Sequence, residues 1–262
     1  MIRNAIVALL VVAAGTLLEA MRSRILFVVL FFAVLLVGLS VAAASVSFGE
    51  EGRLIIDVGL AAASAVGAGI GLSLAIASFG GEIKRRTAYT LLARPIPRWA
   101  FVLGKHLGVV GTVTVLVALM VSSTALTVHG YGAANPPALW AALWLTLIEM
   151  QVVVALATLF SALTSPILAA AFTVGMVLAG NLAGDIARFA DRLSAKGQAG
   201  GLVLRAVYYL LPDLGRLSFR IEAANDLPVS LRYVAWSTSY GLGYAAVVLL
   251  VACLIFGRRR VV

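Results

Sequence analysis

The stretch GGEIKRRTAYTLLARPIPRWAFVLGK, residues 80–105, is a concentrated block of charge between two long apolar runs of this chain. It carries six cations against a single carboxylate, that of Glu82. Cations that flank membrane spans stay on the cytoplasmic side of the membrane. The block therefore predicts the direction in which each neighbouring apolar run crosses. Its cations are Lys84, Arg85, Arg86, Arg94, Arg98 and Lys105.

The composition is that of an integral membrane protein. Of the 262 residues, 62% are hydrophobic and 12% are charged, and the mean hydropathy is +1.07; soluble domains carry about 25% charged residues. Several apolar runs reach the roughly 20 residues that a helix needs to cross a bilayer, and none alternates as a β-barrel strand does. The formal charge of +9 lies beside these runs and on no soluble face, so nucleic acid is not an expected partner.

These runs predict an all-α membrane protein whose single transmembrane domain covers residues 1–262, with six membrane spans and both termini in the cytoplasm. Residues 4–24 are short for a crossing, and we interpret them as an amphipathic helix in the lipid interface; a signal peptide is the alternative. Residues 183–232 are expected to form a structured outer loop along the membrane surface. The spans are predicted at residues 25–46, 54–79, 107–128, 138–163, 166–182 and 233–256.

The distribution of charge agrees with this topology. It places twelve of the twenty lysines and arginines in the cytoplasm and eight outside. Only Glu19 and Glu82 offset the inner cations, whereas acidic residues balance the outer ones. An excess of cations in the cytoplasmic segments is what the positive-inside rule requires.

The second span is rich in small residues. Ala63, Gly67 and Gly71 follow one another at four-residue spacing, which lets another helix approach closely. The alternative is that such residues are simply common in membrane helices.

Within the charged block, Gly80-Gly81 is expected to end the second span, because glycine is the usual residue past a helix end. Glu82 at the start and Arg94 at the end of a new helix would each interact favourably with its dipole. The predicted helix, residues 82–93, has about 12 residues and is too short to be stable alone in water. It therefore needs a surface to pack on. A partner protein is one such surface, and lipid headgroups are the alternative.

The block resembles the cytoplasmic signature of ABC-2 type permeases, the membrane subunits of a large class of ATP-binding-cassette exporters. The chain is similar to the six-span permeases related to the membrane subunit of the nitrous-oxide-reductase maturation transporter. TLLEAMRSRIL at residues 16–26 and LLPDL at 210–214 resemble further segments of that family. The residues of the block that carry the likeness are Glu82, Arg86-Thr87, Leu91-Leu92, Arg94-Pro95, Arg98 and Gly104-Lys105.

The resemblance implies a coupling helix in residues 82–98 that docks into a separate cytoplasmic ATPase, which would hold the ATP and Mg²⁺. It also implies a bacterial inner-membrane location and a dimer with a second permease copy, either identical or from another gene. The outer loop, 183–232, would gate the path or dock a periplasmic accessory protein. The implied coupling residues are Glu82, Arg85, Arg86, Thr87, Leu91, Leu92, Arg94, Pro95 and Arg98.

No catalytic or cofactor site is predicted in the chain itself. Gly104-Lys105 is followed by His106, and Trp99 stands where a phosphate-binding loop needs its first glycine. His106 and His129 fall at opposite ends of the third span, so they cannot share a metal ion within one subunit. Cys253 lies inside the last apolar run and is expected to be a small buried hydrophobe.

Glu149 lies in the middle of the fourth span, where an ionised side chain costs at least about 2.5 kcal/mol. Three roles stay open: a hydrogen bond between helices, a part in a substrate path or gate, and a proton relay. Thr146, Gln151 and Asn181 are polar candidates to lie near it.

The function that these features predict is that of an exporter subunit, which couples ATP hydrolysis in a partner chain to export or to signalling across the membrane. The alternative is a secondary carrier or a membrane scaffold without an ATPase. Secondary carriers commonly bind ions and substrate at the membrane midplane between broken helices. Here Glu149 alone lies at that depth.

Overall fold

The computed structural model describes residues 2–22, 51–85, 97–132, 134–196 and 200–258, together with a few positions between 31 and 42. Over these residues the regular structure is helical and contains no strand. The helices are α1 (Ile2–Arg22), α3 (Glu51–Arg85), α5 (Arg98–Gly130), α6 (Pro137–Leu163), α7 (Pro166–Asn181), α8 (Ala183–Ala195), α9 (Gly200–Leu210), the 3-10 turn η1 (Leu214–Arg216), α10 (Arg220–Ala224) and α11 (Leu231–Arg258).

The described helices are those of a multi-pass membrane protein. Four of them, α3, α5, α6 and α11, are long and apolar enough to cross a membrane. The pair α7 and α8, bent by 62°, makes a fifth crossing if it is counted as one span. The first predicted span, 25–46, lies almost entirely outside the described residues, so six spans stay a prediction.

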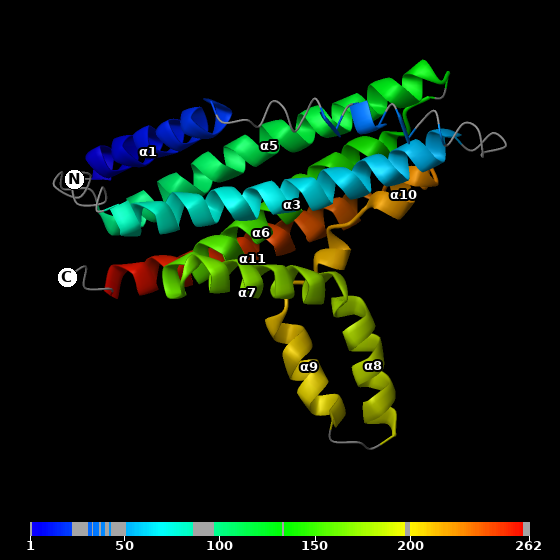
Figure 1. The fold of residues 1–262 in the computed structure, drawn as a ribbon. Coiled ribbons are helices and arrows are strands. Elements are labelled where there is room, and N and C mark those ends of the chain that lie inside the picture. The colour runs from blue at the N-terminus through cyan, green and yellow to red at the C-terminus, as the bar shows by residue number, and fades with distance from the viewer. Residues whose placement is uncertain are drawn as a thin grey trace.

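The long helices run side by side in one bundle (Figure 1). One end of the bundle holds the end of α3, the start of α5 and the end of α11; we call it the Arg98 end. The opposite end holds the start of α3, the end of α5 and the start of α11; we call it the Tyr131 end. The two flanks of the charged block therefore lie together at the Arg98 end.

The small residues of α3 pack in a groove between α5 and α6. Ala63 is fully buried. A Cβ added to Gly67 would lie 2.7 Å from Cγ2 of Val117 in α5, and one added to Gly71 would lie 3.0 Å from Cγ2 of Val154 in α6. The predicted close approach at these positions is confirmed.

The helix α3 continues through Gly80-Gly81, where the sequence predicts a break. Glycine ends a helix when the chain turns into the left-handed conformation. Among the described glycines only Gly132, with φ of 76°, has a positive φ. Residues 82–85 are thus the last turn of α3 and not the start of a separate helix, and the predicted helix start at Glu82 is wrong.

The N-terminal helix α1 packs lengthwise along the first half of α5. A Cβ on Gly104 would meet the carbonyl oxygen of Leu9 at 2.8 Å, and a Cβ on Gly108 would meet that of Ala13 at 2.7 Å. The later residue of α5 thus meets the later residue of α1, so the two helices run in the same direction, as Figure 1 also shows. Whether α1 lies in the lipid interface stays a prediction.

The described part of residues 183–232 contains α8, α9, the 3-10 turn η1 and the short helix α10, and α11 begins at Leu231. The hairpin of α8 and α9 projects sideways from the bundle (Figure 1). Its helices touch at Gly201, where an added Cβ would lie 2.8 Å from the backbone nitrogen of Ser194. Whether the hairpin lies on the outer membrane surface stays a prediction.

Replacing Gly67 by alanine will destabilise the protein, since the new methyl group must displace the buried Val117 side chain. Overpacking of this kind costs about 1–3 kcal/mol. Gly69→Ala is the matched control on the same helix, because a Cβ at Gly69 meets nothing within 4 Å. In thermal unfolding of the purified protein, Gly67→Ala will lower the midpoint while Gly69→Ala leaves or raises it. Equal midpoints for the two variants would contradict this packing.

Candidate functional site

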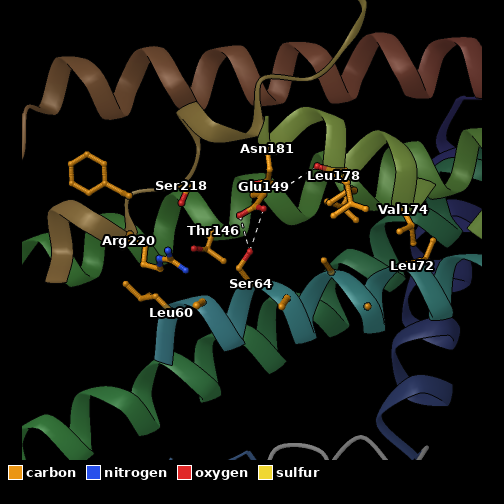
Figure 2. Close-up of a pocket in the computed structure, with 18 of the residues that line it drawn as sticks. Leu60, Ser64, Leu72, Thr146, Glu149, Val174, Leu178, Asn181, Ser218 and Arg220 are labelled. Atoms are coloured by element: carbon orange, nitrogen blue, oxygen red, sulfur yellow. Dashed lines mark hydrogen bonds between the residues drawn. The ribbon is translucent and has the colours of Figure 1, made fainter. Parts of the chain in front are cut away.

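A cavity of about 450 Å³ lies between α3, α6 and α7 (Figure 2). Its walls are largely apolar, with Leu60 and Leu72 from α3 and Val174 and Leu178 from α7. Residues 218–220, between η1 and α10, line it toward the Tyr131 end. The cavity is thus lined by three helices and one segment of the predicted outer loop.

Glu149 lines this cavity from the middle of α6 and is only 4% exposed. The hydroxyl of Ser64 in α3 lies 3.1 and 3.3 Å from its two carboxylate oxygens, so one hydroxyl hydrogen is shared between them. No described lysine or arginine forms an ion pair with Glu149. The carboxyl group therefore has one weak donor and no countercharge from the described chain.

The cavity rim carries a balanced pair of charges. Arg220 donates from Nε to Oδ1 of Asp57 at 3.0 Å, with 43% and 41% of the two side chains exposed. The two charges cancel at short range. Among the described lining residues, Arg220 and Glu149 are the ionisable ones. The only uncompensated charge that the cavity can hold is thus a negative one on Glu149.

Two of the three predicted polar neighbours of Glu149 line the same cavity. Thr146 lies one turn before Glu149 on α6 and is 6% exposed. Asn181, at the end of α7, donates from Nδ2 to the carbonyl of Val177, which leaves its Oδ1 as an acceptor. Gln151 instead lies near His106 of α5 and does not line the cavity.

The sequence did not single out Ser64, the hydrogen-bond partner of Glu149. This residue stands beside Ala63 in a run of alanines and glycines, where its hydroxyl looks like one more small side chain. The indication that the sequence offers is the position of Ser64, which directly follows Ala63, one of the small residues at four-residue spacing on α3.

Most of the predicted coupling residues lie outside the described residues, namely Arg86, Thr87, Leu91, Leu92, Arg94 and Pro95. Glu82 and Arg85 belong to the last helical turn of α3, and their side chains are not among those described. Arg98 opens α5 and donates from Nη1 to the carbonyl oxygen of Gly257 at 3.2 Å. It thereby satisfies one of the last carbonyls of α11, which have no partner within their own helix.

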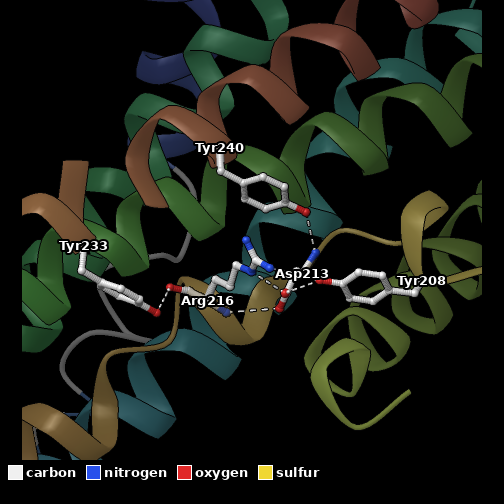
Figure 3. Close-up of polar contacts among 5 residues, drawn as sticks. All are labelled: Tyr208, Asp213, Arg216, Tyr233 and Tyr240. Carbon is white, nitrogen blue, oxygen red and sulfur yellow. Dashed lines mark hydrogen bonds and ion pairs between the residues drawn. The ribbon is translucent and has the colours of Figure 1, made fainter. Parts of the chain in front are cut away.

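A second polar cluster fastens the LLPDL segment to α11 (Figure 3). The backbone nitrogen of Asp213 donates to the hydroxyl of Tyr240 at 2.8 Å, and the hydroxyl of Tyr233 donates to the carbonyl of Arg216 at 2.9 Å. The hydroxyl of Tyr244 donates to the carbonyl of Leu210 at 3.1 Å. Three tyrosines of one helix thus hold both sides of the segment.

The carboxylate of Asp213 organises the segment itself. Its Oδ2 accepts from Nε of Arg216 at 2.7 Å and from the hydroxyl of Tyr208 at 3.3 Å, while Oδ1 accepts from the backbone nitrogen of Arg216 at 3.3 Å. Burial lowers the pKa of Arg216, but the hydrogen bond and the charge of Asp213 outweigh it, so the net pKa is raised. The Arg216 guanidinium is therefore held in its charged form beside Asp213.

Neither a protein-family model nor a curated protein matches this chain. In the part of the chain that the structure describes, no three metal-binding side chains lie together. The fold and the site geometry thus identify only the general class of protein, a multi-pass helical membrane protein with an apolar cavity and a buried carboxyl group. The ABC-2 resemblance stays a matter of sequence motifs.

Removing the Asp213 carboxylate will loosen the LLPDL segment. Asp213→Ala leaves Arg216 and Tyr208 without their acceptor, and hydrogen bonds to charged groups contribute about 1.5–3 kcal/mol each. Amide hydrogen exchange over residues 205–217 will accelerate by about tenfold or more, which corresponds to the lower end of that range.

The control is Asp191→Ala on the α8–α9 hairpin. Asp191 pairs with Arg205 at 2.9 Å, but more than half of each side chain is exposed. Such surface pairs contribute about 0.2–1 kcal/mol. Comparable exchange rates in the two variants would show that the Asp213 network does not hold the segment.

Proposed function

We propose that this chain is the transmembrane subunit of an ATP-binding-cassette exporter of the ABC-2 type, in the bacterial inner membrane with both termini in the cytoplasm. Two copies would assemble with two copies of a separate cytoplasmic ATPase. The observation that carries the proposal is the block at residues 80–105, with its family-like motif and six cations. Its support in the fold is that both flanks of the block meet at the Arg98 end (Figure 1).

The proposed coupling is mechanical. The ATPases close on ATP and push the block, and the membrane helices rearrange to open the cavity outward. The helix α3 is continuous from Glu51 to Arg85. At a rise of about 1.5 Å per residue, this unbroken helix is long enough to reach from the block past the cavity to the Tyr131 end. It would therefore move as one rigid element and carry motion along that length.

Arg98 would spread the same motion to a second helix. Its hydrogen bond to Gly257 joins the start of α5 to the end of α11. A push on the block would then displace α3, α5 and α11 together. In this proposal Arg98 also transmits force inside the subunit.

The cavity would be the place where cargo sits, and the α8–α9 hairpin would be the place where an outer protein could receive force instead. A carrier without an ATPase remains the second candidate. The 62° bend between α7, which lines the cavity, and α8 favours it, since carriers commonly use broken helices at their ion sites. The presence of only one carboxyl group among the described cavity residues speaks against it.

The association with an ATPase is tested by pull-down of the tagged full chain from its native membranes. We expect an ATP-binding-cassette ATPase to be retained. The double variant Arg86→Glu with Leu91→Asp will lose it, because it reverses one charge and buries another in the contact surface. The matched control is Arg188→Glu with Leu202→Asp in the α8–α9 hairpin, where both side chains are exposed. It will retain the ATPase.

The orientation is tested by labelling a single cysteine at Lys84 in intact cells, with Cys253 replaced by alanine. A membrane-impermeant thiol reagent should fail to reach Lys84→Cys until the cells are opened. Labelling from the periplasm would put the block out of reach of any ATPase and overturn the proposal.

A further inference from the structure

We propose that the cavity between α3, α6 and α7 binds a lipophilic monocation, that is, a molecule with one positively charged nitrogen and an apolar body. The inference rests on the proposed function only where it treats this molecule as cargo. Binding itself needs no ATPase. The observation behind it is a buried carboxyl group that faces an apolar cavity and has no countercharge among the described residues.

The electrostatics of the cavity select the sign of the ligand. A carboxylate at the centre of a membrane costs at least about 2.5 kcal/mol and is normally paired. The only described partner of Glu149 is the hydroxyl of Ser64. A bound cation would supply the missing charge, whereas an anion would meet an unbalanced negative group.

The hydrogen-bonding groups that line the cavity favour a ligand whose cation is a nitrogen with N–H groups. An ionised carboxylate offers about four acceptor positions, and Ser64 donates a single hydrogen to them. Asn181 keeps Oδ1 as an acceptor, and Thr146 adds a hydroxyl oxygen at the same wall. An ammonium group has three donors, so these oxygens can surround it.

The shape of the cavity selects an apolar body of modest size. Ligand pockets typically enclose about 300–1,000 Å³, and this cavity of about 450 Å³ is at the small end of that range. Figure 2 shows Leu72 and Val174 on one side of Glu149 and Arg220 on the other. Because the Arg220 side carries a polar ion pair with Asp57 while Leu72 and Val174 are apolar, the ammonium lies at Glu149 and the apolar body extends toward Leu72 and Val174.

The test compares three eight-carbon chains that differ in charge: octylammonium, octanol and octanoate. Their binding to the purified full-length chain in phosphatidylcholine nanodiscs is measured by titration calorimetry, with empty nanodiscs subtracted to remove partitioning into lipid. We expect saturable binding of octylammonium to one site per chain. Its affinity should exceed that of octanol by about tenfold or more, and octanoate should not bind.

Glu149→Gln keeps the size of the side chain and removes its charge, so octylammonium should fall to the affinity of octanol. Asp185→Asn is the control, since Asp185 is exposed on α8 and does not line the cavity. If Glu149→Gln fails to fold, Ser64→Ala tests the same idea. It removes the competing donor and should bind octylammonium at least as tightly as the unmodified chain.

Equal affinities for the three chains, or unchanged octylammonium binding in Glu149→Gln, would overturn the inference. So would loss of octylammonium binding in a folded Ser64→Ala variant, because the Ser64 bond would then shape the site. A chain that binds octylammonium yet retains no ATPase contradicts the exporter proposal alone. A chain that retains the ATPase yet lacks the cation preference contradicts only the present inference.

Discussion

The close packing of α3 between α5 and α6 is the constraint on which the rest of the structure depends. Lipid provides no hydrophobic force between helices, so small residues that let backbones approach must supply the attraction. Gly67 and Gly71 do so against Val117 and Val154. The same approach turns the neighbouring face of α3 toward α7, where it lines the cavity and brings Ser64 to Glu149. The small residues of α3 thus determine both where this helix packs and which of its residues line the cavity.

Much of the fold could be predicted from the sequence because the bilayer imposes a length and a polarity on every span. The spans predicted at 54–79, 138–163 and 233–256 agree with α3, α6 and α11 to within a few residues, apart from the last turn of α3. That turn was missed because glycine is tolerated inside a helix at a cost of about 1 kcal/mol as well as favoured after one. Sequence alone does not say which use Gly80-Gly81 serves.

The other features that the sequence did not predict are contacts between distant segments. The packing of α1 on α5 depends on Gly104 and Gly108, whose four-residue spacing was a usable signal. The burial of Glu149 in the middle of α6 could be predicted, because it follows from one residue in one span. Its partner Ser64 is 85 positions away, and the carbonyl that Arg98 caps is 159 positions away. No local pattern reports such pairs, since they depend on how the helices are rotated against one another.

The two ends of α11 connect the charged block to the cavity. At the Arg98 end, Arg98 holds the carbonyl of Gly257; at the other end, Tyr240 and Tyr233 hold the backbone of Asp213 and Arg216. The residues that follow η1 line the cavity, and Arg220 among them pairs with Asp57 of α3. Because both ends are fastened by directional hydrogen bonds, α11 cannot slide relative to α5 without moving the cavity lining. In the proposed mechanism, motion at the block would therefore reach the cavity lining through α11 as well as through α3.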